Sequence, residues 1–177
     1  MSSAHASQLE RILEPESAEE FLASVWGRTY KHVRGRRGKF AQLLPWDELS
    51  ELLRRQRLDF PRLRLMRDGK PVAVSTYVRQ VTPARSRRAI PRLLPVGFTR
   101  HLREGATLVL DAVDELNGPL EELAEGLELT FRERIQINCY AGWRTTRGFD
   151  LHWDDHDVFI LQVAGRKRWS VYGMTRP

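Results

Sequence analysis

The fold is decided by residues 134–172, which read RIQINCYAGWRTTRGFDLHWDDHDVFILQVAGRKRWSVY. Apolar and polar residues alternate at the start of this stretch, with Ile135, Ile137 and Cys139 on one side of the pattern. The run 158–163 is rich in β-branched and aromatic residues, and a second alternating segment follows the turn after it. Alternation with a period of two is typical of strands that bury one face. The stretch therefore predicts successive antiparallel strands.

Helical patterns dominate the part of the chain that precedes this stretch. They begin at Ser17, where a Ser and a Glu three residues later form a capping box, at Pro45 and at Asn117. Between them, Asp68-Gly69 is a hairpin signal with a return strand expected over 72–78, 82–96 predicts a proline-rich and arginine-rich loop, and the apolar run 106–110 predicts a buried strand. Helices first and strands later indicate an α+β protein with a β-sandwich or barrel at its C-terminal end.

The polar cluster at 152–157 contains the candidate metal-binding residues. Residues two apart on a strand share a face, so His152 and Asp154 are expected to point the same way. An imidazole and a carboxylate on one face form two thirds of the two-histidine, one-carboxylate triad that holds iron(II) in non-haem oxygenases. The competing interpretation is a set of surface polar residues at a strand end. A third is a local site that adds His156, but ligands spaced ~7 Å apart along a flat strand diverge too far to share one ion.

Other polar residues flank the cluster. Arg166, Lys167 and Arg168 follow the next strand and could reach a negatively charged co-substrate, while Asn138 and Tyr140 share a face of the strand that leads into the cluster. Cys139 lies between them and is interpreted as a small buried apolar residue rather than a nucleophile.

The long pattern of Gly148-Phe149, His152-x-Asp154, Asp157-Val-Phe, Gln162 and Gly165-Arg-Lys-x-Trp169 resembles the JmjC cupin-like oxygenases, in particular the ribosomal-oxygenase branch and its bacterial relatives. The lead-in from Phe21 to Val33 and the strand 105–110 are similar to the same branch, so the resemblance covers most of residues 17–177.

The resemblance implies an Fe(II)- and 2-oxoglutarate-dependent hydroxylase. His152 and Asp154 match the first two iron ligands, and Lys167 matches the residue that binds the distal carboxylate of 2-oxoglutarate. Asn138 and Tyr140 match pocket residues beside the co-substrate, whereas His156 matches no ligand. The implied reaction couples oxidative decarboxylation of 2-oxoglutarate to hydroxylation of a substrate C–H bond, with a protein side chain or a small molecule as the substrate.

One departure from the family pattern concerns the barrel. The third iron ligand of the family is a downstream His, and no His follows His156 in this sequence. Residues 134–177 have room for roughly four strands, about half of a double-stranded β-helix. We therefore expect a disordered N-terminus at 1–16, a helical and mixed lead-in at 17–133 and a partial, truncated barrel at 134–177.

The alternative function is a catalytically inactive cupin-like interaction module. The strand edges of an incomplete barrel would be uncovered, which predicts poor solubility or a homodimer.

The charge is unevenly distributed along the chain. The net charge is +6, but residues 28–103 hold 20 basic and 5 acidic side chains. Such a segment could bind nucleic acid or an acidic protein, although no RNA-recognition motif accompanies it and a solvated face is an equally good interpretation. No apolar run is long enough for a membrane span, no signal peptide is visible and Cys139 is the single cysteine, so the expected location is the cytoplasm.

Overall fold

The computed structural model describes residues 3–55, 58, 60–85, 88–144 and 149–173. The chain forms two compact units, and each is described by itself. The first unit contains residues 1–49, 117–135 and 153–177; the second contains residues 50–116 and 136–152. Each unit thus combines segments from both sides of residue 133. The expected domain boundary there stays a prediction.

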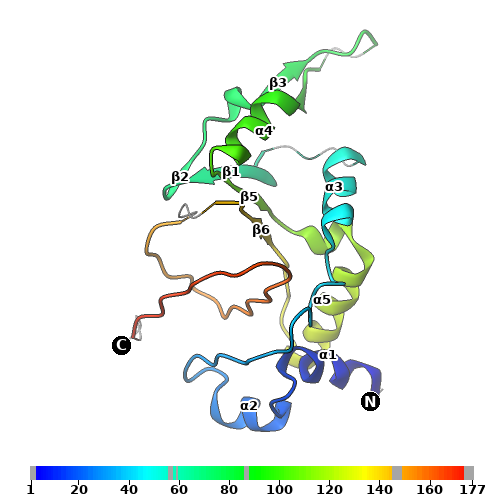
Figure 1. The fold of residues 1–177 in the computed structure, drawn as a ribbon. Coiled ribbons are helices and arrows are strands. Elements are labelled where there is room, and N and C mark those ends of the chain that lie inside the picture. The colour runs from blue at the N-terminus through cyan, green and yellow to red at the C-terminus, as the bar shows by residue number, and fades with distance from the viewer. Residues whose placement is uncertain (1–2, 56–57, 59, 86–87, 145–148, 174–177) are drawn as a thin grey trace. The chain divides into compact units, whose positions relative to one another are not determined.

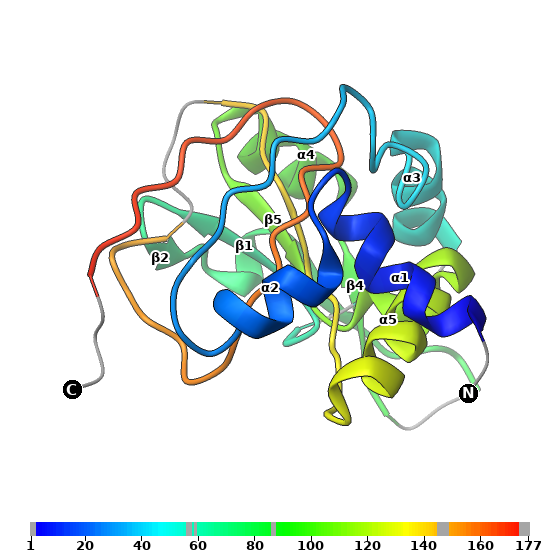
Figure 2. The same ribbon diagram turned by 90° about the horizontal axis from the view of Figure 1, so that it is seen from below.

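Helices build the first unit (Figures 1 and 2). Helix α1 (Ser3–Leu13) packs against α5 (Gly118–Phe131), and α2 (Ala18–Ser24) follows α1 along the chain. The two packed helices come close at Gly126, where an added Cβ would meet the side chain of Gln8. A fourth helix, α3 (Trp46–Arg55), begins in this unit and runs into the second.

The expected disorder of residues 1–16 is wrong for the described part of that segment. Residues 3–13 are helical, because Leu9, Ile12 and Leu13 recur at helical spacing and are buried. The apolar face of α5 carries Leu120, Leu123 and Leu127, as the sequence indicated. The helix α1 therefore belongs to the folded first unit, through the burial of Leu9, Ile12 and Leu13.

Side-chain caps begin two of these helices where the sequence predicted starts. The Ser17 hydroxyl accepts a hydrogen bond from the backbone N–H of Glu20 at 3.3 Å. The Asn117 side chain accepts one from the N–H of Leu120, also at 3.3 Å. Each cap satisfies a backbone donor that has no partner inside its own helix.

The second unit is built on a four-stranded antiparallel sheet in the order β2-β1-β5-β6 (Figure 1). Its strands are β1 (Leu63–Arg67), β2 (Lys70–Pro71), β5 (Thr107–Leu110) and β6 (Cys139–Ala141). Strand β5 lies between β1 and β6, and Leu108, Val109 and Leu110 are fully buried. The continuous apolar run that predicted a buried strand is thus confirmed, because a central strand covered on both faces needs no polar side chain.

The turn between β1 and β2 is a two-residue hairpin. Asp68 and Gly69 both have positive φ, at 49° and 77°, which is the conformation of a type I′ turn. The return strand is shorter than the sequence indicated. It pairs over Lys70–Pro71 only and gives way to a 3₁₀ turn, η1 (Val74–Thr76). Pro71 lies on the edge strand, where its missing N–H costs no ladder hydrogen bond.

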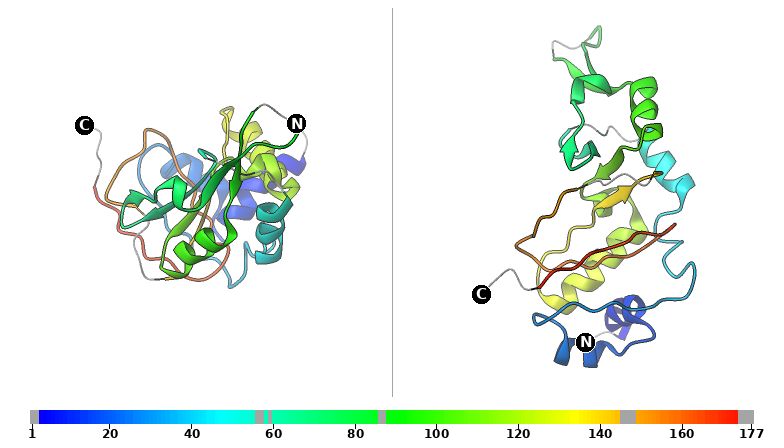
Figure 3. Two further views of the ribbon diagram at one scale, coloured as in Figure 1. Left: turned by 90° about the horizontal axis from the view of Figure 1, so that it is seen from above. Right: turned by 60° about the vertical axis from the view of Figure 1, so that its left-hand side comes forward.

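A second hairpin pairs β3 (Val78–Val81) with β4 (Ile90–Leu93) and is followed by helix α4 (Pro95–Arg103). The loop expected over 82–96 is wrong for its second half, because residues 90–93 form β4. The hairpin extends away from the four-stranded sheet of its unit (Figure 3). The 3₁₀ turn η2 (Val113–Leu116) completes the unit's regular structure within the described residues.

Residues 149–173 contain no assigned strand, although strands were expected over 158–163 and 167–172. A strand exists only where a neighbouring segment completes its hydrogen bonds. Between these two segments, Gly165 adopts φ 70° in the expected turn. The α+β class with antiparallel sheets is confirmed, and half of a double-stranded β-helix stays a prediction. No helix in the described ranges is long and apolar enough to cross a bilayer.

An aromatic cluster of the first unit anchors the segment 158–163. The ring of Phe159 lies 5.7 Å from that of Trp26, nearly parallel at 13°, and 5.6 Å from that of Phe131. Phe21 joins the cluster at 5.9 Å from Phe159. The lead-in helices α2 and α5 are thereby tied to the segment that follows the polar cluster.

Candidate metal and co-substrate site

His152 is held in one tautomer by its own backbone neighbourhood. Its Nδ1 lies 2.7 Å from the carbonyl oxygen of Asp150. A carbonyl oxygen only accepts hydrogen bonds, so Nδ1 carries the hydrogen and donates it. In the neutral ring the lone pair is then on Nε2. This is the arrangement of a metal-binding imidazole, in which a second hydrogen bond fixes the ring and its tautomer.

Asp150, whose carbonyl oxygen accepts this hydrogen bond, contacts the turn of the β1–β2 hairpin. The Asp150 carboxylate lies against Gly69, in the space that a Cβ at residue 69 would occupy. Glycine is therefore needed at the turn for two reasons, its positive φ and the room it leaves for a carboxylate. The hairpin tip supports the backbone that orients His152.

An aromatic chain connects strand β6 to the candidate ligand. The ring of Tyr140 meets that of Phe149 edge-on, with centroids 5.5 Å apart and planes at 79°. Phe149 in turn lies 5.7 Å from the imidazole of His152. Tyr140 and His152, which we expected in one site, thus both contact a single phenyl ring.

Asn138 holds the entrance of β6 in place. Its Oδ1 accepts hydrogen bonds from the backbone N–H of Ala112 at 3.0 Å and from the side chain of Gln136 at 2.8 Å. The next residue back, Ile137, donates its N–H to the Asp114 carboxylate at 2.8 Å. Oδ1 of Asn138 therefore fastens β6 to the loop after β5, and a role for this residue beside a co-substrate stays a prediction.

Asp154 and Lys167 belong to the first unit, whereas His152, Tyr140 and Asn138 belong to the second. The Lys167 ammonium lies 4.3 Å from the centre of the Trp169 ring, a cation–π contact. Partial removal from water lowers the pKa of Lys167 below its ordinary value. The first motif residue, Gly148, lies outside the described residues.

The metal-ligand roles of His152 and Asp154 stay predictions. Within the ranges that the structure describes, no three His, Cys, Asp or Glu side chains gather closely enough to hold an ion. Asp154 and His156 are exposed, as is His152. The structure shows the hydrogen bond that fixes the ring of His152 and the close approach of Asp150 to Gly69.

Cys139 pairs with Leu110 in the sheet. Burial raises the pKa of its thiol to about 11. The thiolate that a nucleophile requires is scarce near neutral pH at such a value. This agrees with the interpretation of Cys139 as a packing residue.

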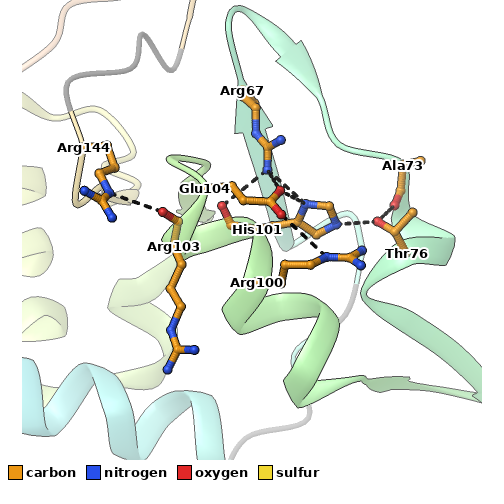
Figure 4. A network of polar contacts seen from close by, with 8 residues as sticks. All are labelled: Arg67, Ala73, Thr76, Arg100, His101, Arg103, Glu104 and Arg144. Carbon is orange, nitrogen blue, oxygen red and sulfur yellow. Dashed lines mark hydrogen bonds and ion pairs between the residues drawn. The ribbon is translucent and has the colours of Figure 1, made fainter.

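A second titratable cluster, around His101, is structural (Figure 4). Nη2 of Arg67 lies 3.1 Å from Nδ1 of His101, and Arg67 also pairs with Glu104 at 2.9 Å. Because arginine can only donate, Nδ1 accepts and Nε2 donates to the Thr76 hydroxyl at 2.8 Å. That hydroxyl in turn donates to the carbonyl of Ala73 at 2.6 Å. His101 is buried and joins β1, η1 and α4.

Comparison with known proteins points to one family. The JmjC domain matches residues 119–177. The chain is similar to the bifunctional lysine-specific demethylase and histidyl-hydroxylase NO66 of Dictyostelium discoideum, 29% identical over 165 residues. It is also similar to ribosomal oxygenase 1 of Gallus gallus, 28% identical over 163 residues.

These similarities run through nearly all of this chain but through a minor part of the relatives. They cover 91% of the chain and 30% of the Dictyostelium protein, and 92% of the chain and 26% of the chicken protein. The matched JmjC segment includes the polar cluster at 152–157 and the Gly165-Arg166-Lys167 segment. The family resemblance seen in the sequence, to JmjC proteins of the ribosomal-oxygenase type, is confirmed.

Proposed function

We propose that this chain contributes the first half of the catalytic domain of a JmjC oxygenase that uses Fe(II) and 2-oxoglutarate to hydroxylate a protein side chain. The observation that carries the proposal is the hydrogen bond from Nδ1 of His152 to the carbonyl of Asp150. It leaves the Nε2 lone pair as the donor for a metal, with an acidic residue two positions later.

The donor chemistry fits iron(II). Neutral imidazole and carboxylate are the ligand types of the non-haem iron triad, and His152 and Asp154 would supply one of each. When bound, the metal would supply the activation of O₂ and the oxidation of the 2-oxo acid. The residues of this chain would bind and orient: Lys167 as the cation for the distal carboxylate, and Tyr140 with Phe149 as the wall beside His152.

We base the proposed substrate class on the names of the relatives. Their names describe a lysine-specific demethylase and histidyl-hydroxylase in one case and a ribosomal oxygenase in the other. We propose a side chain of a protein as the substrate. The inactive interaction module expected as the alternative shares the fold but predicts no metal binding that depends on His152.

The test is a titration of the 177-residue chain with Mn(II), a redox-stable substitute for Fe(II), followed by electron paramagnetic resonance with and without 2-oxoglutarate. We expect 2-oxoglutarate to tighten Mn(II) binding roughly tenfold or more in the parent chain, because it supplies further ligands. His152→Ala should remove Mn(II) binding. Lys167→Met should preserve binding of Mn(II) alone and remove the effect of 2-oxoglutarate.

His156→Ala is the matched control, because it removes the same side-chain type from the same acidic cluster. We expect it to bind Mn(II) as the parent does. Equal losses in the two histidine variants would favour the local site that includes His156. Absence of Mn(II) binding in the parent chain, with or without 2-oxoglutarate, would overturn the oxygenase assignment for this chain and leave the interaction module.

A further inference from the structure

The β3–β4 hairpin lies in a segment that carries basic but no acidic side chains. Residues 69–103 contain eight Lys or Arg and neither Asp nor Glu. Seven of the eight are arginines, and Arg79, Arg85, Arg88 and Arg92 of the hairpin are exposed. No acidic side chain of residues 69–103 is therefore available to pair with these arginines.

The strand register concentrates this charge. Arg79 of β3 is the direct partner of Arg92 of β4, so both side chains leave the hairpin on the same face. The backbone hydrogen bond from Leu94 to the carbonyl of Tyr77, two residues away, places them in a hydrogen-bonded pair, with Cα atoms ~5.5 Å apart. Like charges opposed in this way destabilise a hairpin. An anion bound between them would remove that cost.

The kind of partner follows from the side chains present. The guanidinium group is planar and binds phosphate through two parallel hydrogen bonds, which an ammonium cannot do. Residues 78–93 include no Phe, Tyr or Trp, so the hairpin has no platform on which unpaired bases could stack. A duplex presents a dense row of phosphates and hides its bases. A two-stranded ribbon also has the width that the major groove of B-form DNA accepts.

We propose that the β3–β4 hairpin, with Arg79 and Arg92 at its centre, is a docking surface for the phosphate backbone of double-stranded nucleic acid. The proposal does not depend on the oxygenase assignment, because no candidate ligand or co-substrate residue lies in the hairpin. Duplex RNA and duplex DNA share the recognised chemistry, and the experiment distinguishes them.

The test measures binding of the 177-residue chain to fluorescent duplex RNA and duplex DNA of one sequence, by anisotropy, at low salt and at roughly fourfold higher salt. Arg79→Gln with Arg92→Gln should weaken binding roughly tenfold at low salt. It should also reduce the slope of log K against log salt by about 2, because each arginine removed leaves one phosphate with its counterions. The duplex bound more tightly by the parent chain identifies the source of the phosphates.

The matched control is Arg54→Gln with Arg55→Gln, which removes the same charge from α3, where both arginines are paired with Glu51. It should leave the slope within about half a unit of the parent value. Equal effects of the two double variants would show attraction by net charge only and overturn the proposal. So would the absence of duplex binding, or tighter binding to polyglutamate than to either duplex, which would identify an acidic protein as the partner. Unchanged thermal melting of both variants confirms that each is folded.

Discussion

The carboxylate of Asp150 lies in the space that a Cβ on Gly69 would fill, although the two residues are far apart in the sequence. Gly69 is the second residue of the hairpin turn, and Asp150 is the residue whose carbonyl accepts the hydrogen bond of His152. A turn early in the chain therefore supports the backbone that orients the candidate iron ligand.

Gly69→Ala should destabilise the protein and weaken Mn(II) binding together. The positive φ alone costs roughly 1–2 kcal/mol for a residue with a Cβ, and displacement of Asp150 adds to it. Denaturant unfolding and the Mn(II) titration measure the two effects. The control is Gly27→Ala, which has a similar positive φ and open space around its Cβ, and should lose stability without loss of Mn(II) affinity.

A second comparison isolates the contact with Asp150. Adding Asp150→Ala to Gly69→Ala should recover the part of the stability loss that comes from the clash and leave the part that comes from φ. If the losses of the two single variants simply add, the carboxylate does not occupy that space in solution.

Phe159→Ala should destabilise the first unit by about 2 kcal/mol, less than a fully buried Phe would, because the ring is half-buried in its cluster with Trp26 and Phe131. Urea unfolding followed by tryptophan fluorescence measures the change. The neighbouring substitution Ile160→Ala, at a side chain that is 51% exposed, should change stability by no more than about 0.5 kcal/mol. Equal effects at both positions would contradict the packing of Phe159.

Stability should fall as the pH drops below about 6.5, through the titration of His101. Burial lowers the pKa of His101, and Arg67 and Arg100 lower it further against the opposing effect of Glu104. The unfolded chain then binds a proton before the folded chain does, so acidification favours unfolding until the lowered folded pKa is passed. Urea unfolding at a series of pH values measures this slope.

The dependence should become flatter in His101→Gln, which cannot titrate. His32→Gln, at an exposed histidine, is the control and should retain the slope of the parent chain. A slope unchanged in His101→Gln would assign the pH dependence to other groups.

Affinity for 2-oxoglutarate should fall on the alkaline side at a lower pH than an ordinary lysine would allow. Lys167 holds its proposed ligand only while it is charged, and partial desolvation lowers its pKa. Titrations of 2-oxoglutarate across alkaline pH measure the fall. In Lys167→Arg the affinity should be independent of pH over that range, since a guanidinium keeps its charge. The same alkaline fall in the Arg variant would place the titration elsewhere.

Local signals determined much of this protein. The caps at Ser17 and Asn117, the Asp68-Gly69 turn and the buried run that became β5 need only neighbouring residues to act, and the structure has each of them. The motif around His152 likewise indicated the resemblance to JmjC proteins, because a long spaced pattern of residue types is specific without any coordinates.

Other elements of this protein form only through contacts between residues that are distant in the sequence. The helix at 3–13 forms because α5 covers its apolar face, and Ile90–Leu93 is a strand because Val78–Val81 supplies its hydrogen bonds. Conversely, 158–163 has strand propensity but no assigned partner strand in the described structure, and Phe159 is held by aromatic packing instead. Pairing and burial are properties of two segments at once, so a pattern within one segment cannot decide them. The sequence alone named His152; only the folded chain showed that Asp150 and Gly69 orient it.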